Sequence, residues 1–164
     1  MNGSMTHSGL MRHAAAWVVA AILSAPVSAA PAQPGPNGGT DVQRVFQAVQ
    51  STGAATLKQS KDGPRITAEA GRGPIGYAVV FSGCDAAGRY CTHMVLEVLW
   101  RDLALDDAAR WNREWRAGRA YMDGDLLVLD HWVSLGGGMS DESLNELMAW
   151  WTALMEEARA QFYD

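Results

Sequence analysis

The feature that most limits the fold is a long one-sided helix near the C-terminus. From residue 140 onward, apolar side chains recur every three or four positions, which is the spacing of one helical face. Ser140 is placed to cap this helix, and Met139 can pack onto Leu144 in its first turn. The apolar stripe consists of Leu144, Leu147, Met148, Trp151, Leu154, Met155, Ala158 and Phe162. Such a stripe predicts a helix that packs one face on a core.

Alternating residues upstream of this helix predict strands, most clearly over residues 91–100. The other predicted strands are residues 55–59, 65–69, 76–82, 119–122 and 126–132, and Asp123-Gly124 predicts a tight hairpin between the last two. Two more helices are predicted, one starting at Thr40 or Asp41 and ending before Gly53, and a second over residues 107–116. This order predicts the α+β class, with a single antiparallel sheet and the helices packed on one of its faces.

Residues 1–30 have the pattern of a cleavable secretory signal peptide. Arg12 is the only charged side chain there, an apolar run covers residues 14–23, and small residues follow at 27–30. The run is about half the length that a membrane-spanning helix needs, so a permanent anchor is the weaker alternative. We expect a periplasmic or secreted protein, cleaved after Ala29 or Ala30, with no membrane anchor afterwards.

The rest of the chain is predicted to be a flexible linker over residues 31–40 and one folded domain over residues 41–164. Prolines and glycines dominate residues 31–39 and leave little apolar surface to bury. Loss of residues 1–30 removes Arg12 and no acidic residue, which takes the net charge from −5 to −6. A mildly acidic surface argues against nucleic acid and anionic lipid as partners.

The only two cysteines, Cys84 and Cys91, flank the turn between two predicted strands. An even cysteine count in an exported chain predicts a disulfide between them. The alternative is a redox-active pair, although the spacing is not Cys-x-x-Cys. Zinc would need further ligands, and only His93 is near, so no metal site and no cofactor are predicted.

No set of residues in the sequence predicts an active site. His93 and Glu97 fall on one strand face, but four residues of strand separate them by roughly 13 Å. His131 follows Asp130 directly, so their side chains point to opposite faces of a strand. A small hydrolase that uses His93 or His131 with a nearby carboxylate remains the alternative to a binding protein.

Three tryptophans are candidates for binding a partner. Trp111 and Trp115 lie one turn apart on the second helix, whose inward face Ala108 and Ala109 could already fill. Trp150 lies at the edge of the long apolar stripe, and packing within the domain is the alternative for all three. Large aromatic residues left outside the core predict a homodimer, through the outer side of the sheet or through the second helix. The alternative is a monomer.

Several short motifs together resemble the YbjN-domain family, whose members are described as bacterial sensory transduction regulators. These motifs are Gly83-Cys84 with Cys91, Trp111-Asn112, Arg119-Ala120-Tyr121-Met122-Asp123 with Gly124-Asp125-Leu126, and Gly137-Gly138-Met139-Ser140 ahead of Trp151. The resemblance covers about residues 41–160. It implies a fold like that of class I type III secretion chaperones, which bind other polypeptides and often pair. No catalytic residues carry over, so we expect a non-enzymatic, chaperone-like or regulatory module that binds an unidentified protein.

Overall fold

The structure is a computed structural model that describes residues 33–163. The described residues belong to one compact unit. The signal peptide expected over residues 1–30 lies outside the described residues and stays a prediction. Between residues 33 and 163, no helix combines the length and the apolar content that crossing a membrane requires.

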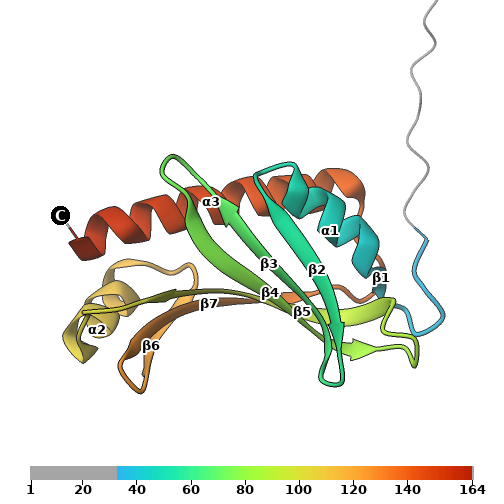
Figure 1. Cartoon of the computed structure of the whole chain (residues 1–164), viewed down its shortest axis with the longest axis horizontal. Coiled ribbons are helices and arrows are strands. Elements are labelled where there is room, and N and C mark those ends of the chain that lie inside the picture. Colours follow the sequence, from blue (N-terminus) through green and yellow to red (C-terminus); the bar gives the residue numbers. More distant parts are fainter. Residues whose placement is uncertain (1–32, 164) are drawn as a thin grey trace, which may run out of the picture. The chain divides into compact units, whose positions relative to one another are not determined.

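The described residues form one antiparallel sheet of seven strands and three helices (Figure 1). In chain order the elements are β1 (Thr40–Asp41), α1 (Val42–Gln50), β2 (Ala55–Ser60), β3 (Gly63–Ala70), β4 (Ile75–Cys84), β5 (Tyr90–Trp100), α2 (Leu105–Glu114), β6 (Arg119–Asp123), β7 (Leu126–Ser134) and α3 (Asp141–Tyr163). The strands lie in the order β2-β3-β4-β5-β7-β6, and β1 pairs with β5. The predicted α+β class with a single antiparallel sheet is confirmed.

The core lies between the sheet and the long helix α3, which runs across the sheet in Figure 1. On β5 the alternate residues Met94, Leu96 and Val98 are fully buried, as the period of two predicts. The buried residues of α3 are Leu144, Met148, Trp151, Leu154, Met155, Ala158 and Phe162. Ser140 caps the helix as predicted, because its hydroxyl accepts a hydrogen bond from the Ser143 N–H at 3.1 Å.

The second helix, α2, turns out to bury one of the tryptophans that the sequence placed outside the core. Trp111 is 1% exposed and lies 5.6 Å from the ring of Phe162 on α3. The expected exposure of Trp111 is wrong because the inward face of α2 holds Trp111 together with Ala108, where small Ala108 leaves room for the large ring. Trp115 stacks on Trp111 at 5.1 Å and is partly buried as a result.

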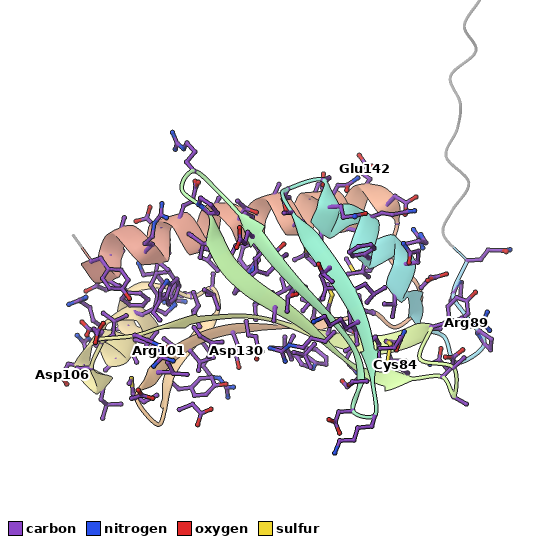
Figure 2. The ribbon with its side chains drawn as sticks, viewed as in Figure 1. Cys84, Arg89, Arg101, Asp106, Asp130 and Glu142 are labelled. Carbon is purple, nitrogen blue, oxygen red and sulfur yellow. A yellow bond between two sulfur atoms is a disulfide. The ribbon has the colours of Figure 1, made fainter. Side chains whose placement is uncertain are left out.

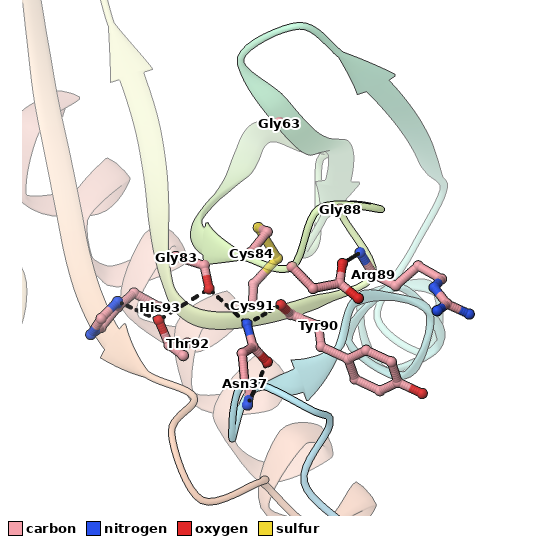
Figure 3. The surroundings of a disulfide bond; sticks show 12 residues. Asn37, Gly63, Gly83, Cys84, Gly88, Arg89, Tyr90, Cys91, Thr92 and His93 are labelled. Atoms are coloured by element: carbon pink, nitrogen blue, oxygen red, sulfur yellow. Dashed lines mark hydrogen bonds between the residues drawn. A yellow bond between two sulfur atoms is a disulfide. The ribbon is translucent and has the colours of Figure 1, made fainter.

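The last residues of the expected linker are tied to the folded domain. Thr40 is buried, and its hydroxyl donates to the Leu135 carbonyl and accepts from the Met139 N–H, both at 3.0 Å. The Asn37 amide donates to the carbonyls of Gly83 and Tyr90 at 3.0 and 2.8 Å (Figure 3). A free linker as far as residue 40 is therefore wrong for residues 37–40, because distant backbone carbonyls hold their polar side chains.

The predicted disulfide joins Cys84 at the end of β4 to Cys91 near the start of β5 (Figure 3). The two residues are cross-strand partners with Cα atoms 3.8 Å apart, and Cys91 is fully buried. β1 pairs with β5 at Cys91 and Tyr90, so the disulfide lies beside the segment that leads into α1.

Reduction of this disulfide should lower the stability of the domain without abolishing its fold. Opening a loop this short removes about 2 to 3 kcal/mol from the free energy of unfolding on the chain-entropy estimate. Urea unfolding of the purified domain with and without dithiothreitol measures the change. The double variant Cys84→Ser/Cys91→Ser is the control and should not respond to the reductant. An equal response of both proteins would contradict the prediction.

Candidate functional site

The face of the sheet that points away from α1 and α3 is the outer face, and among the described residues no helix covers it. Strand register places its side chains in rows that cross the sheet. One row consists of Arg65, Val80, Val95 and Trp132. Trp132 is 58% exposed, although its cross-strand partner is the apolar Val95. The outer face is therefore partly apolar and open to solvent.

A neighbouring row of the outer face holds two carboxylates, each paired with an arginine. Glu97 and Asp130 are direct cross-strand partners on β5 and β7, an unfavourable position for two like charges. Arg65 Nη2 lies 2.6 Å from Glu97 Oε1, and Arg119 Nη2 lies 2.7 Å from Asp130 Oδ2. The hydrogen bond and the charge of Asp130 raise the pKa of Arg119. Figure 2 shows Asp130 on the side of the sheet opposite α3.

The sheet has a gap at its β6 margin, beside the second half of β7. β6 pairs with β7 only as far as Arg119 and Asp130, whereas β7 continues to Ser134. In the described part of the chain, no strand lies beside residues 131–134 on that side. A Cβ atom at Gly118 would lie 2.9 Å from Leu129 Cδ1, and Gly118 has a φ of +71°, so glycine lets the chain turn away close to β7.

The gap forms a hollow of about 540 Å³ lined by Val95, Gly118, Arg119, Asp130, His131 and Trp132. Trp150 of α3 lies next to this hollow, because its ring is 4.8 Å from the ring of His131. Trp150 is also 37% exposed. We call the hollow together with Trp150 the aromatic notch. It brings two exposed tryptophans and an exposed arginine to one segment of β7 from both faces of the sheet.

The three candidate tryptophans, Trp111, Trp115 and Trp150, differ in burial. Trp111 is part of the core and Trp115 is stacked on it, whereas Trp150 is part of the notch and reaches solvent there. Sequence reasoning missed Trp132 and Arg119. Counting pairs outward from the Gly124-Asp125 turn would have found them, because a five-residue β6 reaches only Asp130 on the nine-residue β7.

The two histidines named as candidates lie in different surroundings. His93 Nδ1 lies 3.0 Å from the Thr92 hydroxyl, and the His93 ring lies 5.0 Å from the ring of Trp132. His131 faces Trp150, on the opposite side of β7 from Asp130. Within residues 33–163, neither imidazole is hydrogen-bonded to a carboxylate, and no three potential metal ligands come together.

Burial under Trp150 changes the protonation of His131. Desolvation lowers the pKa of the imidazole, and the negative charge of Asp130 opposes this shift only in part. The neutral form of His131 is therefore the one that the folded notch favours. A partner that covered the notch further would strengthen the same preference.

Comparison with known proteins identifies one family. A family model named YbjN, with the description "Putative bacterial sensory transduction regulator", matches residues 41–164. The matched residues include the disulfide, the whole of the aromatic notch and all elements from α1 to α3. No curated protein matches the chain with significant similarity.

The low pKa of His131 predicts a loss of stability in mild acid. The unfolded chain binds the proton first, so the free energy of unfolding decreases as the pH falls through about 6.5, the pKa of an exposed histidine. The variant His131→Gln lacks this contribution, and its stability should change less between about pH 7 and pH 5. Urea unfolding of both proteins at the two pH values makes the test. An identical pH dependence, or an NMR titration of His131 above the usual pKa, would contradict it.

Proposed function

Because the chain belongs to the YbjN family, we propose that it is a non-enzymatic regulatory or chaperone-like module that binds a polypeptide partner at the aromatic notch. The signal peptide expected over residues 1–30 would carry it to the periplasm, where this partner would be found. The family model matched over residues 41–164 is the basis of the family assignment, and the notch is the basis of the proposed binding.

One observation carries the proposal: Trp132, Trp150 and Arg119 surround a stretch of β7 that has no strand beside it on the β6 side in the described part of the chain. Tryptophan and arginine are the residue types that contribute most to protein interfaces. Neither Trp132 nor Trp150 belongs to the core cluster, so both rings are available to a partner. Residues 131–134 pair with β5 on one side, and on the other side their backbone would offer hydrogen bonds to a polypeptide and little to a small apolar ligand.

A variant of the notch should distinguish specific binding there from nonspecific binding to exposed apolar side chains elsewhere. Trp132→Ala should reduce capture of the partner by at least about tenfold, since truncating an interface anchor costs roughly 2 kcal/mol or more. Leu105→Ala is the matched control, because Leu105 is 69% exposed on α2 and lies outside the notch. The measurement is photo-cross-linking in a periplasmic extract, followed by quantitative mass spectrometry. Equal capture by the wild type and both variants would end the proposal.

The homodimer expected from the sequence stays a prediction for the outer face alone. The argument for a dimer through α2 rested on exposed Trp111 and Trp115, of which Trp111 is buried and Trp115 is stacked on it and partly buried. The row of Val80, Val95 and Trp132 on the outer face still offers apolar surface that a second copy would cover. Sedimentation equilibrium of the mature domain should show a dimer that Trp132→Ala weakens. A single species of monomer mass throughout the micromolar range would contradict the dimer.

A further inference from the structure

The two outermost strands of the sheet, β6 and β2, are protected very differently (Figure 1). At β6, the side-chain amide of Asn112 from α2 donates to the Ala120 carbonyl at 2.7 Å and accepts from the Ala120 N–H at 2.9 Å. Asn112 thus takes the place that the backbone of a further strand would occupy. An added strand at β6 would have to displace it.

No described side chain makes such bonds to the backbone of β2. All six of its residues pair with β3 on one side, and its polar side chains are largely exposed. Antiparallel pairs alternate between hydrogen-bonded and non-hydrogen-bonded, and Pro64 has no N–H to donate to its partner Gln59. Gln59, and with it Leu57 and Ala55, therefore directs its backbone N–H and carbonyl away from β3.

The open edge also carries positive charge on an otherwise acidic chain. The only two lysines of the sequence are Lys58 on β2 and Lys61 in the turn that follows, whereas the whole chain has a net charge of −5. Lys58 lies directly across from Arg65, whose guanidinium pairs with Glu97. Lys58 itself has no ion pair among the described residues, so its charge is left for a partner.

We propose that β2 takes an additional strand from an acidic, extended polypeptide segment, with a carboxylate of that segment beside Lys58. Main-chain hydrogen bonds to Ala55, Leu57 and Gln59 would hold the segment, as in other cases of strand addition. The residue across from Lys58 would project onto the outer face. A hollow of about 570 Å³, lined among others by Thr56 and Thr67, lies there and accommodates long side chains.

The positive charge of Lys58 also disfavours a second copy of this chain as the ligand of the β2 edge. Antiparallel pairing of β2 with its own copy, in the register centred on Lys58, would place the two Lys58 side chains directly across from each other, which is unfavourable for like charges. An acidic segment meets no such repulsion. This site is separate from the aromatic notch, at the opposite margin of the sheet, and shares with the proposed function only the polypeptide nature of the ligand.

NMR with a synthetic probe tests the proposal directly. The probe is an eight-residue peptide of alternating threonine and glutamate, added to ¹⁵N-labelled mature protein, and its counterpart has lysine in place of glutamate. We expect saturable shifts of the amides of Ala55, Leu57 and Gln59 with the acidic peptide and at least fivefold weaker binding of the basic one. Trp132→Ala should leave these shifts unchanged, which separates this site from the notch.

Two substitutions at the edge complete the test. Gln59→Pro removes an outward N–H that the sheet does not use and should abolish binding, whereas the matched control Gln59→Ala keeps the N–H and should bind. Lys58→Glu leaves the backbone intact and should reverse the preference to the basic peptide, which keeps the test valid if the proline variant does not fold. Shifts at residues 131–134 or at Asn112 instead of β2, equal affinity for the two peptides, or no shift at millimolar peptide would overturn the proposal.

Discussion

The structure depends on the packing of one long helix, α3, against one face of the sheet. Its buried stripe extends from Leu144 to Phe162 and meets the inward residues of β5, of which Leu96 is fully buried. A helix has a single apolar stripe, so α3 can cover only one side of a sheet. The other face is therefore exposed to solvent, and it carries the charged pairs Arg65–Glu97 and Arg119–Asp130. The solvent-exposed face that both proposed binding sites border follows from the coverage of only one face by α3.

The margins of the sheet add a second constraint, since every open sheet has two edge strands whose backbone is only half paired. This domain blocks one edge with Asn112 of α2 and leaves β2 open beside its two lysines. It also makes β6 shorter than β7, which exposes residues 131–134. These two places are where a polypeptide could pair with the sheet without displacing any contact of the core.

Local patterns were sufficient to predict the elements that depend on neighbouring residues. Residues 91–100 and the α3 stripe were found because their periods are long and regular, and the disulfide because its cysteines flank one turn. Contacts between distant segments were not predictable in this way. Thr40 bonds to Leu135, 95 residues away, and Trp111 is buried because Phe162 of α3 packs on it. The notch was missed because it depends on where β6 stops relative to β7.

The tryptophans of the described domain range from fully buried to exposed. Trp111 and Trp151 are fully buried, so removing either ring would leave a cavity in the core and destabilise the fold. Trp132 and Trp150 contribute no such burial, and an exposed indole favours association in water. Each packs on the partly exposed ring of a histidine, His93 for Trp132 and His131 for Trp150, and therefore stabilises the fold less than the buried tryptophans do. Their convergence on the stretch of β7 that has no strand on its β6 side in the described residues, with Arg119 beside them, is the arrangement from which we propose polypeptide binding.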